Sequence, residues 1–197
     1  MKRVLDIIFA TTGLVVFSPC FFIVALLILL EDGPPVLFVQ ERLGKEMKPF
    51  RIYKFRSMRG SRVTQVGRWI RATGLDELFQ FLNVLQGSMG VVGPRPMTAD
   101  DVARLGWHET GMARWRCKPG VTGLAQLFAG KGLQVSRFLD ESYARNGSLW
   151  LDFQVIVLSF MVNCFGKRRV RCTLLQWRAW RRNKRRTARK HASEEKS

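Results

Sequence analysis

The sequence predicts an α+β protein that is mostly helical. It has an N-terminal re-entrant membrane helix kinked at a Ser-Pro step, a small β-hairpin, and a cytoplasmic globular domain with amphipathic interfacial helices. Three observations predict this class. The run from Ile7 to Leu30 carries no charged residue. Two short runs rich in Val, Phe, Ile and Tyr follow it, and helix-periodic stretches separated by turn signals make up most of the remaining chain. The expected limits are 1–32 for the membrane helix, 33–166 for the globular domain and 167–197 for a basic tail, amphipathic or disordered.

The apolar run is long enough to cross a bilayer and too long for the core of a signal peptide. Ser18 and Pro19 lie in its middle, where proline removes a helix hydrogen bond and predicts a sharp kink. Lys2 and Arg3 precede the run, and further basic residues follow it from Arg42 onward. The positive-inside tendency therefore holds both ends on the cytoplasmic face, which a re-entrant helix permits. A straight span and a buried soluble helix are the alternatives.

The segments VLFVQERLG (36–44) and FRIYKFRSM (50–58) predict a β-hairpin. Helices are expected at 64–72, then from Leu75 to Leu85, where leucines and Phe79 form one apolar stripe. Further helices are expected at 100–115, 135–146 and 149–165, the last one packed on the core or lying at a membrane interface.

The charge balance points to anionic partners. The chain has 33 Lys and Arg against 15 Asp and Glu, a formal net charge of +18. The tail 167–197 interleaves tryptophan with arginine, so we expect it to lie on anionic lipid headgroups. A nucleic-acid-binding tail and a solvated disordered end are the alternatives, with nucleic acid the less favoured partner. The four cysteines lack CxxC spacing and the two histidines lie far apart, which argues against a zinc site, a disulfide framework or a histidine relay.

Asp76 and Glu77 stand where the apolar stripe begins. One interpretation is capping: Thr73 would be the N-cap of a T-x-x-D pattern, and the helix dipole would stabilise both acids. The other is catalysis, because a carboxylate held at a helix start can attack phosphorus. A divalent cation held by Asp76 and Glu77, with Mg²⁺ the usual choice for diphosphates, would then offset the repulsion between anions.

The segment GPRP places Arg95 between two prolines. The fixed φ angles of Pro94 and Pro96 hold the intervening arginine on a stiff extended arm. Its planar guanidinium suits a phosphate or a nucleobase edge. A rigid surface turn with a solvated arginine is the alternative.

In combination, these segments resemble the bacterial sugar transferases, the monotopic phosphoglycosyl transferases that begin glycoconjugate assembly on polyprenyl phosphate. The matching pieces span roughly residues 1–166: the Phe17-Ser18-Pro19 step, FVQERLG, YKFRSM, GRWIRATGLDELFQFLNVLQGSMGVVGPRP, KPGVTGLAQ, LDESY and SLWLDF. Each piece alone is weak, but the ordered set is specific.

The resemblance implies that Asp76 attacks the β-phosphate of a nucleoside diphosphate sugar, usually UDP-linked, and that Glu77 assists. UMP would leave, and polyprenyl phosphate would take the sugar phosphate from the enzyme. It also implies Mg²⁺, residence on the cytoplasmic face of the bacterial inner membrane, and phosphate or nucleotide contacts from a set of matching positions: Lys54, Arg56, Arg71, Arg95, Lys118 and Asp140.

The chain departs from the family pattern at Ser88, Lys118 and Lys131, which puts donor preference there in question. The rival hypothesis is a catalytically inactive, membrane-tethered basic adaptor that binds anionic lipid or nucleic acid. A degenerate member that keeps the fold without the activity is a third alternative. The chain could also form a homodimer, although no residue pattern shows it.

Overall fold

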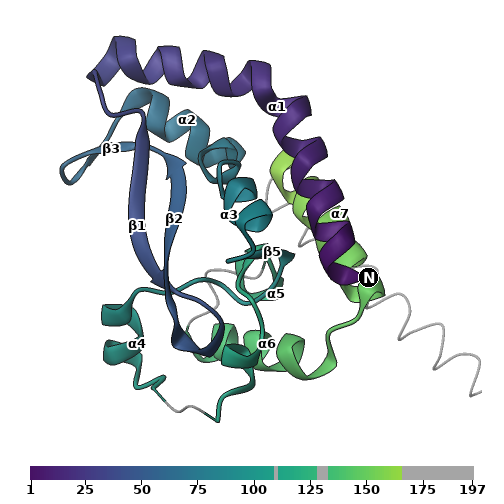
Figure 1. Ribbon diagram of the computed structural model, residues 1–197. Helices are drawn as coiled ribbons and strands as arrows, with labels where there is room; N and C mark the ends of the chain where they lie inside the picture. Colours follow the sequence, from purple (N-terminus) through teal and green to yellow (C-terminus); the bar gives the residue numbers. More distant parts are fainter. Residues whose placement is uncertain (109–110, 128–132, 166–197) are drawn as a thin grey trace, which may run out of the picture. The chain divides into compact units, whose positions relative to one another are not determined.

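The computed structural model describes residues 1–108, 111–127 and 133–165 (Figure 1). Its α-helices are α1 (Lys2–Asp32), α2 (Gln65–Thr73), α3 (Gln80–Gln86), α4 (Ala99–Leu105), α5 (Leu124–Leu127), α6 (Leu133–Asn146) and α7 (Leu149–Phe165). Its strands are β1 (Leu37–Leu43), β2 (Pro49–Phe55), β3 (Met58–Arg59), β4 (Arg62–Val63), β5 (Gly90–Val92) and β6 (Gly120–Thr122). Short 3₁₀ helices are η1 (Lys45–Met47), η2 (Leu75–Glu77) and η3 (Ala113–Arg116). The described residues are thus mostly helical with small sheets, as predicted.

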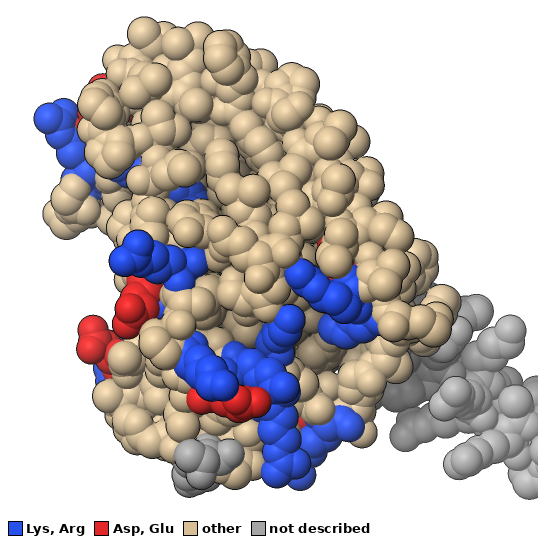
Figure 2. All heavy atoms as spheres, viewed as in Figure 1, with Lys and Arg blue, Asp and Glu red and all other residues tan. Residues whose placement is uncertain are grey.

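Helix α1 is long and apolar enough to cross a membrane by length and composition. Figure 1 shows that its two halves run in different directions, and Pro19 lies inside it. The Ser18 hydroxyl donates to the carbonyl of Val15 over 2.8 Å. One side of α1 is buried, whereas Phe22 on the outer side is 74% exposed. The surface that α1 forms in Figure 2 is accordingly tan, while charged residues gather lower on the same face. The re-entrant course through a membrane stays a prediction.

Polar contacts fix the N-terminal end of α1 to the rest of the fold. The Lys2 ammonium donates to the carbonyl of Val92 over 3.2 Å and to the Tyr143 hydroxyl over 3.0 Å, and it pairs with Asp152 of α7. The Asp6 carboxylate accepts a hydrogen bond of 3.0 Å from the backbone N–H of Val91 in β5.

The C-terminal end of α1 is fixed in a similar way. The Glu31 carboxylate accepts from the backbone N–H groups of Gln65 and Val66, at 2.6 and 2.8 Å, and so caps the start of α2. Arg56 pairs with Asp32 over 3.0 Å. Both ends of α1 are therefore bound to the same globular fold.

The predicted hairpin is confirmed: β1 and β2 pair antiparallel from Leu37 opposite Phe55 to Leu43 opposite Pro49. Two further pairs were not anticipated. Strands β3 and β4 form a short second hairpin, and β5 pairs in parallel with β6, with Gly90 opposite Gly120.

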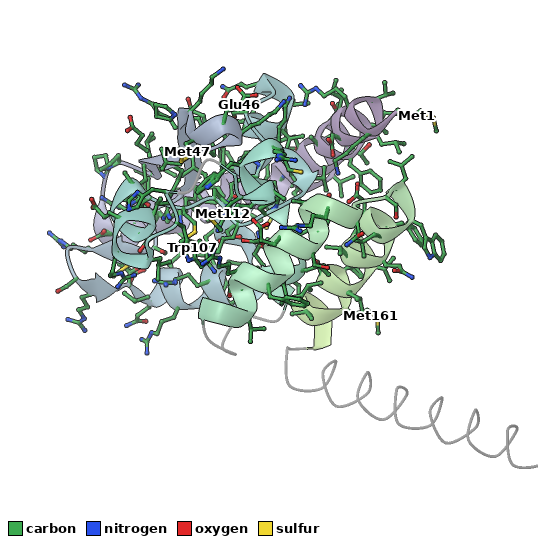
Figure 3. The ribbon with its side chains drawn as sticks, turned by 90° about the horizontal axis from the view of Figure 1, so that it is seen from below. Met1, Glu46, Met47, Trp107, Met112 and Met161 are labelled. Atoms are coloured by element: carbon green, nitrogen blue, oxygen red, sulfur yellow. The ribbon has the colours of Figure 1, made fainter. Side chains whose placement is uncertain are left out.

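Two predicted helices are wrong in extent. The stretch 75–85 is divided into η2 and α3. The stretch 100–115 is also interrupted: α4 ends before Gly106, whose φ of 64° ends the helix, and η3 follows later. The Val102, Trp107, Met112 and Trp115 side chains form a separate apolar cluster in this region, and Figure 3 labels Trp107 and Met112 within it. The helices expected at 64–72, 135–146 and 149–165 are confirmed as α2, α6 and α7.

Two apolar clusters pack α1 onto the domain. One contains Ala10 of α1 with Ile52 of β2 and Val84 of α3. The other contains Val24 and Ile28 of α1. In the second cluster the rings of Phe55 and Phe79 meet edge to face, 4.7 Å apart, and Phe79 also contacts Phe21 of α1. Residues Met1–Ser159 accordingly form one compact unit; the functional limits at 32 and 166 stay predictions.

Candidate active site

Asp76 and Glu77 lie in η2, a single 3₁₀ turn that packs between α2 and β2. The turn begins at Gly74, whose φ of 74° reverses the chain after α2. The backbone N–H of Glu77 donates to the carbonyl of Gly74 over 3.3 Å. The predicted cap is wrong: Thr73 ends α2, and its hydroxyl donates to the carbonyls of Trp69 and Ile70. The acids are thus placed by a tight turn after one helix and not by a capping box before another.

Basic side chains surround the two acids. Lys54 of β2 and Arg71 of α2 both attract the Asp76 carboxylate. Glu77 attracts Lys54 and also Arg42 of β1. The structure therefore brings together the predicted residues Lys54 and Arg71 with the dyad.

Arg95 belongs to the same constellation. Its charge repels those of Lys54 and Arg42, which lie beside the dyad. Arg42 was not singled out from the sequence as a binding residue. The alternation of the strand could have revealed it. Phe38, Gln40 and Arg42 lie on one face of β1, and Phe38 pairs with Lys54, so Arg42 shares a face of the hairpin with Lys54.

Burial and charge act against each other at the site. Burial, followed by repulsion from Glu77, raises the pKa of Asp76 to about 6, although Lys54 and Arg71 pull it down. Burial lowers the pKa of Lys54, with attraction by Glu77 opposing it. Asp76 is therefore mostly ionised at neutral pH but poorly solvated, as a nucleophile toward a phosphate should be.

Arg114 supports the loop that carries Arg95. Its guanidinium donates to the carbonyl of Arg95 over 2.8 Å and lies 4.8 and 4.7 Å from the ring centres of Trp107 and Trp115. It also pairs with Asp140 over 3.4 Å, and the side chains of this pair are 1% and 3% exposed.

Asp140 was predicted to contact substrate. The structure buries it under the GPRP loop, where it also takes a hydrogen bond from the Arg95 backbone. Burial raises the pKa of Asp140 to about 6, and Arg114 opposes that rise. Asp140 is therefore positioned to hold the Arg95 loop in place, and its predicted contact with substrate stays a prediction.

Two other predicted binding residues lie away from the dyad. Arg56 donates to the carbonyls of Asp32, Gly33 and Pro34, so it caps the end of α1. Lys118 lies near Gly87, at the end of α3 opposite to the dyad. Since α3 has seven residues, that end is ~10 Å along the helix. Lys131 lies outside the described residues.

Asn83 is a structural residue that sequence reasoning missed. Its side-chain oxygen accepts from the backbone N–H of Tyr53 over 3.1 Å, and its amide donates to the carbonyl of Arg51 over 2.6 Å. Ser88, one of the departures from the family pattern, donates its hydroxyl to the carbonyl of Asn83 over 3.1 Å. These contacts fasten α3 to β2, the strand that carries Lys54.

The site offers a cation two neighbouring carboxylates. In the part of the chain that the structure describes, no group of three or more His, Cys, Asp or Glu side chains converges. Such a site does not suit zinc. It does suit Mg²⁺, which keeps several waters and commonly takes one or two protein carboxylates together with substrate phosphates.

The described part of the chain thus combines an acidic pair beside lysine and arginine with a long, exposed apolar helix in one compact unit. The family model described as "Bacterial sugar transferase" matches residues 1–166, and the chain belongs to this family.

Curated relatives agree with this membership. The chain is 37% identical over 181 residues to "UDP-glucose:undecaprenyl-phosphate glucose-1-phosphate transferase" of Escherichia coli (strain K12). The matched region covers 81% of this chain and 39% of that protein. It is 40% identical over 178 residues to the protein of the same name from Caulobacter vibrioides, covering 79% and 67%. It is 36% identical over 188 residues to "Exopolysaccharide production protein PSS" of Rhizobium leguminosarum bv. phaseoli, covering 79% and 91%. The chain spans about two fifths of the length of the first of these relatives.

Proposed function

We propose that the protein transfers a sugar phosphate from a UDP-sugar to polyprenyl phosphate, on the cytoplasmic face of the bacterial inner membrane. Family membership supports this reaction class, and so do the names of the relatives from Escherichia coli and Caulobacter vibrioides. The observation that carries the proposal is the partly buried Asp76, with its raised pKa, facing Lys54 and Arg71.

The reaction has two displacements. An oxygen of the Asp76 carboxylate attacks the β-phosphorus of the donor, a phosphorus–oxygen bond to aspartate forms, and the bond to the bridging oxygen breaks so that UMP leaves. An oxygen of polyprenyl phosphate then attacks the same phosphorus. The bond to aspartate breaks, the carboxylate is restored, and a polyprenyl diphosphate sugar is released.

The basic side chains stabilise negative charge in both steps. Lys54 and Arg71 are the cations that attract Asp76, so they are suited to neutralise a diphosphate brought against it. Arg42 and Arg95 add charge from β1 and the GPRP loop. Asp76 and Glu77 would hold Mg²⁺, which when bound would offset the charge of the diphosphate.

The contacts of α1 support a re-entrant course. Lys2 and Asp6 near one end, and Glu31 and Asp32 at the other, all bind groups of the same globular fold. A helix that crossed the bilayer completely would separate its two ends by about 30 Å of hydrocarbon. Both ends of α1 and the catalytic domain therefore belong on one side.

The adaptor alternative depends mainly on the basic tail, which lies outside the described residues. It gives no role to the arrangement of cations around Asp76 and Glu77. It also predicts no turnover, so the experiment below separates the two hypotheses.

The test is release of UMP from a panel of UDP-sugars by detergent-solubilised protein, with Mg²⁺ and polyprenyl phosphate. We expect Asp76→Asn to lower turnover by at least about 10³-fold, because it removes the nucleophile. Asp100→Asn, which changes an exposed acid in the first turn of α4, is the matched control and should retain activity. Wild-type turnover by Asp76→Asn would refute the assignment, and the donor that is consumed would identify the sugar.

A further inference from the structure

A pocket separate from the dyad opens where three elements meet: the C-terminal end of α1, the β3–β4 hairpin and the start of α2. Its lining includes Glu31 and Asp32 from α1, Arg59 and Arg62 from the hairpin, and Arg68 from α2. None of these residues takes part in the proposed phosphoryl transfer.

The pocket has an excess of positive charge. Arg59 and Arg62 lie directly opposite each other across the β3–β4 pair. Like charges at such positions destabilise a strand pair unless an anion lies between them. Arg68 adds a third guanidinium from the first half of α2.

The two acids of the pocket are already engaged. Glu31 accepts both N–H groups at the start of α2, and Asp32 pairs with Arg56 at 3.0 Å and with Arg59 at 3.3 Å. Among the described residues, no ion pair involves Arg62 or Arg68. Arg68 is attracted by the Glu31 carboxylate, but that carboxylate is engaged with the backbone of α2, so Arg62 and Arg68 keep donors for an external anion.

The surroundings of the pocket are apolar and exposed. Leu30, one residue before Glu31, is 74% exposed, and Trp69, one residue after Arg68, is 46% exposed. Tryptophan is enriched where hydrocarbon meets lipid headgroups. The acyl chains of a phospholipid whose phosphate lies in this pocket would therefore have exposed apolar side chains beside them.

We propose that this pocket binds the phosphate headgroup of an anionic phospholipid and fixes the depth of α1 in the bilayer. The proposal rests on the membrane attachment in the proposed function but not on its chemistry. It supplies an anion for Arg62, because of the two arginines that face each other across the hairpin Asp32 pairs with Arg59.

The test measures lipid affinity directly. Full-length protein in detergent is titrated with phosphatidylglycerol and with phosphatidylcholine, and bound lipid is counted by native mass spectrometry. We expect the wild type to prefer phosphatidylglycerol and the double variant Arg62→Gln/Arg68→Gln to lose about 30-fold of that preference, the product of two basic contributions at an anionic surface. The control Arg104→Gln/Arg145→Gln removes two charges from side chains that are 73% and 70% exposed, and should keep the preference.

Equal losses in the double variant and the control would overturn the proposal, because they would show an effect of net charge alone. Displacement of phosphatidylglycerol by millimolar inorganic phosphate would also overturn it, since the site would then take free phosphate. An unchanged circular dichroism spectrum shows that the double variant folds, and Arg62→Lys/Arg68→Lys should retain most of the preference if the variant proves unstable. UMP release is measured in parallel, so loss of lipid binding and loss of catalysis can be told apart.

Discussion

At the scale of single residues, Asp76 has two opposing sets of neighbours. Burial and Glu77 favour its protonated form, and Lys54 and Arg71 favour its ionised form. The net effect raises the pKa of Asp76 from the ordinary aspartate value of 3.8 to about 6. The ionised carboxylate is therefore less stable in the folded protein than in water, which favours its reaction with an electrophile.

This balance predicts the pH dependence of the reaction. A raised pKa means that Asp76 is protonated, and inactive as a nucleophile, below about pH 6. We expect kcat/KM for the UDP-sugar to rise between pH 5 and pH 7 with one apparent pKa near 6, since kcat/KM reports groups of the free enzyme. The measurement is the initial rate of UMP release at constant ionic strength.

Asp140 also has a pKa of about 6 and needs a control. Because Asp140 lies under the Arg95 loop and not in the site, Asp140→Asn should change the height of the pH profile and leave its midpoint in place. A flat profile from pH 5 to pH 7 in the wild type would contradict the role of Asp76. If the rise of kcat/KM near pH 6 disappears in Asp140→Asn, the titrating group is Asp140, in its buried pair with Arg114, and not Asp76.

At the scale of elements, the site depends on how α3 and η2 are held against the hairpin. Asn83 is 1% exposed and bonds to β2 through both its oxygen and its nitrogen. An aliphatic residue there would remove the partly buried hydrogen bonds of the Tyr53 N–H and the Arg51 carbonyl of β2.

We expect Asn83→Leu to lower the free energy of unfolding by about 1–3 kcal/mol, the loss of two partly buried hydrogen bonds. Thermal or denaturant unfolding in detergent measures this loss. Asn146→Leu is the control, because that exposed amide bonds only within α6, to Ser142, and its replacement should change stability little. Equal stability of Asn83→Leu and the wild type would show that Tyr53 and Arg51 find other partners.

The elements also show which features of the fold and the site could be predicted from the sequence. Apolar periodicity located the stripe from Leu75 to Leu85, but a 3₁₀ turn followed by an α-helix keeps nearly the same side-chain spacing, so periodicity could not reveal the division after Glu77. Local patterns predicted Asp76, Glu77 and Arg95 as site residues, whereas Lys54 and Arg71 were predicted only because they match positions of the family.

What the sequence could not reveal depends on distant pairing. Arg56 follows Lys54 by two residues, yet it caps α1, because β2 ends at Phe55 and the chain there meets Asp32. Asp140 is separated from Arg95 by more than 40 positions, and only packing of α6 under the GPRP loop shows that it acts through Arg114. The short parallel pair of β5 and β6 is likewise non-local and too brief to leave a pattern.

At the scale of the whole molecule, α1 and the fold that carries the dyad share an apolar core. Val24 and Ile28 of α1 complete the cluster around Phe55, so β2 carries both Lys54, beside the dyad, and a contact to α1. Phe79, two residues after Glu77, meets Phe21 of α1 at 5.0 Å between ring centres. Under the proposed function, this packing would couple the depth of α1 in the bilayer to the height of the dyad above the lipid, where the polyprenyl phosphate acceptor would present its headgroup.

This arrangement predicts the topology of the chain. We expect epitope tags at both ends to survive protease added to spheroplasts and to be digested in inverted membrane vesicles, since Lys2 binds Tyr143 and Val92 on the domain side. Immunoblotting of the two tags gives the readout, and the C-terminal tag is the internal reference for the cytoplasm. A helix that crosses the bilayer would instead expose the N-terminal tag in spheroplasts. In that topology the Lys2 ammonium could not reach the Asp152 carboxylate, with which it pairs in the structure.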